Sequence, residues 1–269
     1  MLELHLDNFR VVESFFINKK SCVPALSVIH GNYPGRIFVD NEQKPNVAIV
    51  WAIGRWMYLE GYLVSNKNKL DMSSFLQNIV VPDCRENNTN WFEIYTSDDD
   101  PWDHLFLEET KFLKGIKHFE SVYTLNLNEF NKVKKSITSI EDGIEINIKD
   151  FNILPESFRH SPYISDELKT KKSLGVELKK DNQVITICKS NGFILGNEYF
   201  IDVDTFVKEE RGKGRATIAA IKLIDFLLKS DMYPLWETTH ENIPSHKLAL
   251  KLGFEAVEHY PVYAFIIEP

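Results

Sequence analysis

The sequence predicts a mixed α/β fold of the α+β type, with a mostly antiparallel sheet in its C-terminal half. Residues 199–207 alternate apolar and polar side chains with a period of two, which is typical of a half-buried strand. Apolar residues then recur at helical spacing over 218–228, before a Ser-Asp pair and a proline. Short alternating stretches separated by turn residues surround this strand and helix.

The remaining elements of the C-terminal half follow in order after a polar, lysine-rich segment at 128–139. This segment is expected to connect two domains, residues 1–130 and residues 131–269. After it the sequence predicts a strand at 143–149, an irregular helical region at 156–172, a hairpin of 174–178 and 184–188, and then the strand at 199–207. The helix at 218–228 is followed by a strand at 235–239, a short helix after Asn242 and a last strand at 263–267.

The first half repeats part of this plan. Its predicted elements are a hairpin of 37–39 and 47–51, a strand at 91–95, a helix at 102–112 and a strand at 122–125. Residues 65–71, where a second glycine-rich loop would fall, contain neither Gly-x-Gly nor an arginine. Residues 1–130 are therefore interpreted either as a degenerate copy of the C-terminal domain or as an unrelated α+β cap.

Length and composition agree with a soluble enzyme of the cytoplasm. The 269 residues are 43% hydrophobic, and no apolar run approaches the roughly 20 residues that span a bilayer. The N-terminus lacks the features of a secretory signal. Cys22, Cys84 and Cys188 suit neither a disulfide framework nor a metal site. A net charge of −8 disfavours nucleic-acid and membrane partners and is compatible with an amine substrate.

The segment Arg211-Gly212-Lys213-Gly214-Arg215-Ala216 lies between the 199–207 strand and the 218–228 helix. Its two glycines allow a sharp turn and close approach of a ligand to the backbone. Three cations gather at a helix N-terminus, which already carries partial positive charge. A phosphate bound to the free amides of the first turn would relieve this conflict. The sequence therefore predicts a phosphate-binding loop.

The loop is neither a Walker loop, which needs Gly-x-x-x-x-Gly-Lys-Ser/Thr, nor a complete Rossmann turn. Its Arg-x-x-Gly-x-Ala pattern, formed by Arg211, Gly214 and Ala216, resembles the pyrophosphate loop of the GNAT superfamily of acyl-CoA N-acyltransferases. Downstream, the string Asn-x-x-Ser-x-x-Leu-x-x-x-x-Gly-Phe from Asn242 to Phe254 resembles the final helix of a GNAT domain. Over residues 136–269 the sequence is most similar to the zwittermicin A resistance-like branch.

The resemblance implies a GNAT fold whose sheet opens at the cofactor site, and acetyl-CoA as the cosubstrate. It also implies transfer of the acetyl group to a primary amine of a small molecule, a metabolite or an aminopolyol-type antibiotic, by direct attack. The pantetheine arm would pair along the strand edge near Phe206 and Val207. The residues expected to bind the cofactor are Phe206, Val207, Arg211, Gly212, Lys213, Gly214, Arg215, Ala216, Asn242 and Ser245.

Three carboxylates are candidates for the general base that deprotonates the amine: Asp202, Asp204 and Glu237. Each also fits a solvated residue on a sheet face. In many GNATs a tyrosine seven residues after the capping asparagine acts as the general acid that protonates the leaving thiolate. This chain has Ala249 at that position. Tyr233, Tyr260, Tyr263 or water are the possible replacements.

A non-catalytic acyl-CoA-binding or regulatory module is the alternative function, favoured by the missing tyrosine. The sequence identifies neither the acceptor nor the oligomeric state.

Overall fold

The computed structural model describes residues 1–269 except 53, 55, 99–101, 111, 137–140, 155, 159–163 and 269. The chain divides into two compact units. Unit 1 contains Met1–Glu120, Pro155–Lys169 and His259–Pro269, and unit 2 contains Ser121–Leu154 and Thr170–Glu258. The boundary between the units falls inside two long strands, β6 (Lys114–Leu125) and β12 (Phe254–Ile266).

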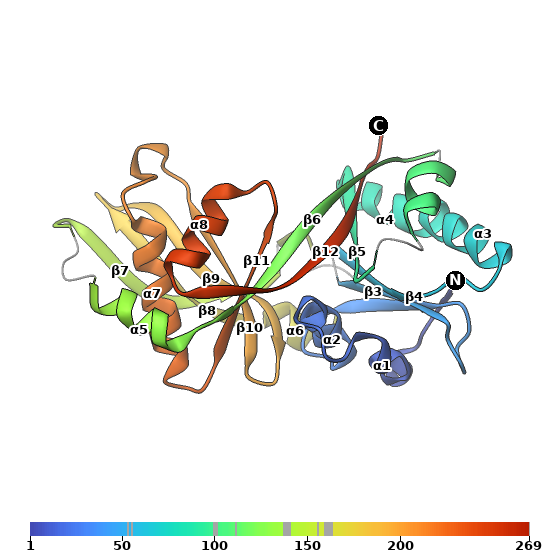
Figure 1. The fold of residues 1–269 in the computed structure, drawn as a ribbon, viewed down its shortest axis with the longest axis horizontal. Coiled ribbons are helices and arrows are strands. Elements are labelled where there is room, and N and C mark those ends of the chain that lie inside the picture. Colours follow the sequence, from blue (N-terminus) through green and yellow to red (C-terminus); the bar gives the residue numbers. More distant parts are fainter. Residues whose placement is uncertain are drawn as a thin grey trace. The chain divides into compact units, whose positions relative to one another are not determined.

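Unit 2 is built on a mixed sheet with the strand order β6-β11-β10-β9-β8-β7 (Figure 1). Besides parts of β6 and β12, its strands are β7 (Ile144–Asn152), β8 (Lys172–Lys180), β9 (Gln183–Leu195), β10 (Glu198–Thr205) and β11 (Tyr233–Thr239). The strands from β7 to β10 are antiparallel to their neighbours, and β11 is parallel to β10. The predicted mixed fold with a mostly antiparallel C-terminal sheet is therefore confirmed.

One face of this sheet is covered by helices that share its core. The helices are α5 (Leu127–Ser136), α7 (Arg215–Leu228) and α8 (Ile243–Lys251), and the 3₁₀ turn η6 (Lys208–Glu210) precedes α7. The apolar stripe of α7, including Ala219 and Leu223, packs against Tyr199 and Ile201 of β10. Alternation along β10 therefore places Asp202 on the opposite face, away from α7.

The strands of unit 1 follow the order β1-β2-β3-β4-β5-β12. The additional strands are β1 (Leu2–Glu3), β2 (Gly35–Val39), β3 (Val47–Ala52), β4 (Trp56–Gly61) and β5 (Trp91–Thr96). The helices are α1 (Glu13–Phe16), α2 (Val23–Ile29), α3 (Asn66–Phe75), α4 (Val81–Glu86) and α6 (Asp166–Thr170). Short helical segments are the 3₁₀ segments η1 (Leu6–Val12), η2 (Lys20–Cys22) and η5 (Glu156–Phe158) and the π-helical segments η3 (Leu76–Val80) and η4 (His104–Glu109).

Several local predictions are confirmed by the backbone. The hairpin between β8 and β9 turns at Asp181 and Asn182, both with positive φ. Asn242 caps α8 by accepting the Ser245 amide hydrogen, and Gly253 follows α8 with φ of +90°. The helix in the structure is shorter than the one predicted at 102–112. Its described helical residues are those of η4, His104–Glu109. Among the described residues, no helix is long and apolar enough to cross a membrane.

Candidate active site

The strands β10 and β11 separate part of the way along their length. Their parallel register runs from Glu198 opposite Tyr233 to Phe200 opposite Leu235. Beyond that pair β10 continues to Thr205 on β9, and β11 continues to Thr239. Within the described part of the sheet, the later residues of these two strands are therefore not paired with each other. Their facing edges are open to the backbone of a ligand.

The loop between β10 and α7 turns on two glycines in the left-handed region. Gly212 has φ of +76° and Gly214 has φ of +78°, and a Cβ atom at either would meet no heavy atom within 4 Å. These glycines are thus favoured by backbone conformation and not by packing. The Arg211 Nε donates to the Thr205 carbonyl at 2.9 Å, which ties the loop to the end of β10.

The N-terminus of α7 lacks a side-chain cap because its N-cap residue is Gly214. The first helical hydrogen bond runs from the Ile218 amide to the Gly214 carbonyl at 3.0 Å. The amides of Arg215, Ala216 and Thr217 precede that bond and have no partner within the helix. Such amides, together with the dipole of a 14-residue helix, form a suitable site for an anion.

The loop cations are already paired with carboxylates. The Arg215 guanidinium is buried, with Nε 2.7 Å from Glu210 and Nη2 bonded to Glu141. The Lys213 ammonium lies 3.0 Å from Glu210, and Lys180 bridges Glu210 and Glu141 at 3.2 and 3.3 Å. Hydrogen bonds from Arg215 and Lys213 lower the pKa of Glu210 to about 2.

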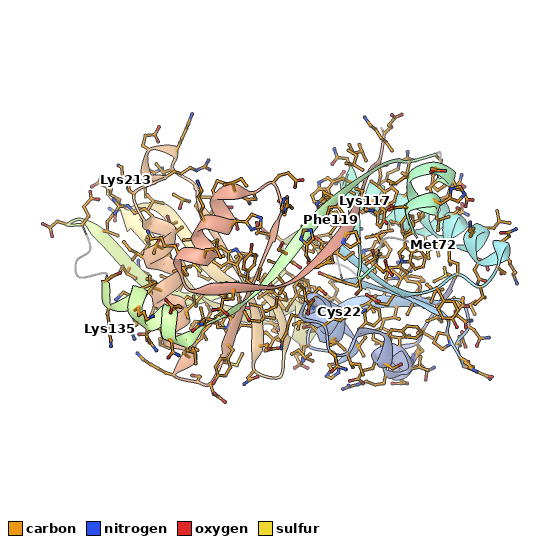
Figure 2. The ribbon with its side chains drawn as sticks, in the orientation of Figure 1. Cys22, Met72, Lys117, Phe119, Lys135 and Lys213 are labelled. Atoms are coloured by element: carbon orange, nitrogen blue, oxygen red, sulfur yellow. The ribbon has the colours of Figure 1, made fainter. Side chains whose placement is uncertain are left out.

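This network corrects the electrostatic argument made from the sequence. Glu210 and Glu141 neutralise cations at the helix start, so a bound phosphate is not required to relieve them. The side chain of Arg215 points into the ion-pair network, which leaves its backbone amide as the group available to a ligand. Lys213 is more exposed, and Figure 2 marks it at the N-terminal end of α7.

The two residues after β10 differ in what their backbone offers. The Phe206 amide donates to the Ile185 carbonyl of β9 at 2.9 Å, so it is already used in the sheet. Phe206 is 54% exposed. Val207 is the N-cap of η6 and has extended backbone angles. Because the Phe206 amide is already bonded within the sheet, the Val207 amide is the better candidate donor to a ligand.

The three candidate carboxylates share the sheet face opposite α7 and α8. Asp202 and Asp204 are two residues apart on β10, opposite Lys189 and Ile187 of β9. Glu237 follows Trp236, whose ring packs in the core on the α8 side. Both aspartates are exposed, and Glu237 is half-buried.

The environment of Asp202 changes its acidity. Desolvation by the surrounding protein raises the pKa of Asp202 to about 6, with Lys189 opposing the shift and Asp204 adding to it. A carboxyl with this pKa is ionised at neutral pH and can still accept a proton readily. Asp202 therefore has an acidity suited to a general base.

The comparison with known proteins identifies the family. The GNAT acetyltransferase family profile matches residues 14–263. The chain belongs to the GNAT acetyltransferase family. GNAT acetyltransferases are acyltransferases that use an acyl-CoA donor.

Individual relatives share the whole length of the chain. The uncharacterized N-acetyltransferase YdfB of Bacillus subtilis (strain 168) is 22% identical over 271 residues, with 97% of each chain covered. The GCN5-related N-acetyltransferase-like protein of Streptococcus suis 89/1591 has a TM-score of 0.65 at 20% identity, covering 96% of this chain and 98% of that one. A GCN5-related N-acetyltransferase of Sphaerobacter thermophilus has a TM-score of 0.57 at 10% identity, covering 100% and 96%.

The polar residues Asn242 and Ser245 at the start of α8 form hydrogen bonds within unit 2. Asn242 caps the helix, and the Ser245 hydroxyl accepts a hydrogen bond from Trp236 Nε1 at 3.0 Å. Ala249 is fully buried and packs with Trp236 in the core of unit 2. The position at which many GNATs carry a tyrosine therefore faces the protein interior in this chain.

The tyrosines considered as replacements lie in different surroundings. Tyr233 starts β11 and donates its hydroxyl to Asp231, at the end of the strand where β10 and β11 are still paired. Tyr260 and Tyr263 belong to unit 1, and Tyr263 donates to Asp103 at 2.6 Å. The position of Tyr233 relative to the open edges makes it a poor proton donor for a thiolate bound there.

An interaction that the sequence did not predict lies beside α8. His246 is half-buried. Its Nε2 donates to the Thr239 carbonyl at 3.1 Å, so Nδ1 accepts the hydroxyl hydrogen of buried Tyr123. This pair connects β6, α8 and the end of β11. No spacing rule predicts it, because Tyr123 and His246 are 123 residues apart.

Proposed function

We propose that unit 2 binds acetyl-CoA and transfers its acetyl group to a primary amine of a small molecule by direct attack. The observation that carries this proposal is the opening between β10 and β11 next to an uncapped helix that starts at a glycine turn. These two features would hold different parts of the same ligand. Family membership supports the acyl-CoA donor.

The cofactor would be held mainly by backbone groups. Amides from Gly212 to Ala216 would donate to the diphosphate, assisted by the dipole of α7. Arg211 would keep the turn attached to β10 through the Thr205 carbonyl. The amides of pantetheine would pair with the free edges beyond Phe200 and Leu235, as an added strand pairs with a sheet edge.

The chemistry needs a neutral amine, because an alkyl ammonium has a pKa near that of lysine, about 10.4. We assign the base to Asp202, directly or through one water, with Asp204 and Glu237 as the other candidates. The amine nitrogen attacks the thioester carbonyl, and the Val207 amide would stabilise the oxyanion. The carbon–sulfur bond then breaks, and the thiolate, with a pKa of about 8.5, can leave with a proton from water.

The acceptor class rests on two observations. The exposed carboxylates Asp202 and Asp204 favour a cationic substrate near β10. Residues 136–269 also resemble the zwittermicin A resistance-like branch, whose substrate class consists of amine-bearing small molecules. A metabolite or aminopolyol-type antibiotic amine is therefore the proposed acceptor.

We assign residues 131–269 as the acetyltransferase domain. The segment 1–130, which contains most of unit 1 (Met1–Glu120), is proposed to be a GNAT-like copy without cofactor chemistry. Its strands β4 and β5 are parallel, as β10 and β11 are, but their pairing continues to Leu59 opposite Thr96. The following helix α3 has a side-chain cap, because the Ser65 hydroxyl accepts the Asn68 amide hydrogen at 3.3 Å. A tandem GNAT protein from the clavulanic acid biosynthesis pathway aligns over 98% of this chain with a TM-score of 0.56 and 10% identity, which supports a two-copy architecture.

The test combines cofactor binding with turnover. Gly214→Asp places a carboxylate at the proposed diphosphate site, whereas Gly196→Asp introduces the same side chain at another open, positive-φ glycine in a β-turn. CoA should raise the unfolding temperature of the wild type and of Gly196→Asp but not of Gly214→Asp. Equal protection of all three proteins would exclude the loop as the cofactor site.

Turnover is measured as thiol release from acetyl-CoA with a panel of primary amines. Release with at least one amine supports the transferase. Tight CoA binding without release for any amine would instead support the non-catalytic binding module. Propionyl-CoA and acetyl-CoA, compared with the same amine, test the assignment of the acetyl group.

A further inference from the structure

The ion-pair network beside the loop has an uneven charge. Three cations, Lys180, Lys213 and Arg215, surround two carboxylates, Glu141 and Glu210, so one positive charge is in excess. If Lys213 leaves, two cations and two carboxylates remain and the network is balanced. Both carboxylates keep a partner when Lys213 leaves, because Lys180 and Arg215 each contact Glu210 and Glu141.

The contacts and exposure of the cations indicate that Lys213 is the one that leaves the network most easily. Lys213 bonds one oxygen of Glu210, Oε1, and Lys180 bonds the same oxygen. The Lys213 side chain is 47% exposed, whereas that of Arg215 is 2% exposed. Arg215 is held by Oε2 of Glu210 and by Glu141. Moving Arg215 to a ligand would break two ion pairs of a buried guanidinium, which is costly.

The carboxylate of Glu210 lies one residue before the loop and holds groups on both sides of Gly214. Lys213 precedes that glycine, and Arg215 is the first residue of α7. Fixing both of them restrains a turn that two glycines would otherwise leave with large conformational freedom. Glu210 therefore holds the loop in its ordered conformation before a ligand binds. The free energy of cofactor binding does not have to offset the entropy cost of ordering the loop.

We propose that Glu210 is a positioning residue that preassembles the phosphate loop and that Lys213 is the cation which transfers from Glu210 to the cofactor diphosphate. Arg215 and Lys180 stay on Glu210 and Glu141 throughout. The inference rests on the proposed function, because it needs the diphosphate to bind at this loop.

The variant Glu210→Gln separates positioning from simple electrostatics by the sign of its effect. Removing this negative charge makes the loop more positive, so an electrostatic role alone predicts tighter binding of CoA. The positioning role predicts the opposite, a Kd for CoA raised about 10-fold, because the loop is no longer restrained. Glu209→Gln, an exposed neighbour with the same charge change, is the control and should stay within twofold of wild type.

The variant Lys213→Met tests the transfer of the cation, with the exposed Lys208→Met as its charge-matched control. Lys213→Met should raise the Kd for CoA about 10-fold and make it less dependent on salt, while Lys208→Met should change it less than threefold. Both Glu210→Gln and Lys213→Met should raise the KM for acetyl-CoA and leave kcat and the KM for the amine near the wild-type values.

Two results would overturn the inference while leaving the proposed function intact. One is unchanged or tighter CoA binding by Glu210→Gln, and the other is equal loss of affinity in Lys213→Met and Lys208→Met. Either result overturns the inference only if Gly214→Asp abolishes CoA binding, because that loss shows that the loop is the cofactor site. If Gly214→Asp binds CoA as the wild type does, the proposed function is wrong and this inference falls with it.

Discussion

Phe200 of β10 and Leu235 of β11 form the last pair in the parallel register of these two strands. Both side chains are almost fully buried, so the sheet is well packed up to this point. Beyond it, β10 follows β9 toward the glycine turn, and β11 continues toward the cap of α8 at Asn242. The pair therefore marks where the sheet changes from a packed core to two edges available to a ligand.

One acyl-CoA molecule is expected to bind per chain. In unit 1 the corresponding parallel strands stay paired to Leu59 and Thr96, and Ser65 caps the helix that follows. Within the described residues, this strand pair therefore lacks the opening, and the helix after it lacks the uncapped start, that unit 2 offers to a cofactor. Isothermal titration calorimetry should give a stoichiometry of one CoA per chain, and a value of two would show that unit 1 also binds it.

The rate of acetyl transfer should depend on the ionisation of Asp202. Because its pKa is raised to about 6, kcat/KM is expected to increase with pH through about pH 6. Asp202→Asn should lower kcat/KM by about 10²–10⁴-fold and remove that step from the profile. The matched variant Asp204→Asn, on the same strand face, should cost less than about fivefold. A larger loss in Asp204→Asn would transfer the role of base to that residue.

The raised pKa of Asp202 predicts that the stability of the folded protein changes with pH. The folded-state pKa of Asp202, about 6, is above its ordinary value of 3.8, so the folded protein binds this proton more tightly than the unfolded chain does. Stability contributed by Asp202 is therefore lost as the pH rises from about 4 to 6. Asp202→Asn should raise the unfolding temperature relative to wild type at pH 8 and not at pH 4. Equal shifts at both values would argue against the raised pKa.

Introducing the tyrosine of other GNATs at position 249 should not improve catalysis. Ala249 is fully buried beside Trp236, so a tyrosine would overpack the core and destabilise the protein by about 1–3 kcal/mol or more. Leu250→Tyr, at the adjacent residue that is 60% exposed, should be tolerated. Chemical denaturation and thiol release measure the two effects. Increased turnover by Ala249→Tyr would contradict the assignment of water as the proton source.

The Tyr123–His246 hydrogen bond should contribute to the stability of unit 2. Tyr123→Phe removes the hydroxyl that donates to Nδ1 and leaves that nitrogen without this donor. The expected loss is about 1 kcal/mol in the free energy of unfolding. The single variant His246→Phe and the double variant Tyr123→Phe/His246→Phe complete a double-mutant cycle. An interaction energy of zero in that cycle would mean that the bond adds nothing to stability.

The sequence was sufficient for the elements that local patterns specify. The alternation along β10 placed Asp202 and Asp204 on one face, and the glycines predicted the turn at 212–214. The cap at Asn242 follows from a short-range side-chain preference. In each case the structure depends on residues that are neighbours in the chain.

The rest depends on long-range contacts that no local pattern contains. Glu141 is 74 residues from Arg215, so the sequence could not show that the cations at the helix start were already neutralised. The strand β4, with its mostly apolar residues, was missed because it lacks clear alternation and lies close to β3 in sequence. The opening between β10 and β11 was expected from family resemblance, whereas its position after Phe200 is given by the structure.

A crystal structure of the protein with acetyl-CoA is the most direct test of the cofactor site. The diphosphate should lie within hydrogen-bond distance of amides between Gly212 and Ala216, with pantetheine between β10 and β11 beyond Phe200. A complex in which the diphosphate binds elsewhere and the turn at Gly214 contacts no part of the cofactor would contradict the account.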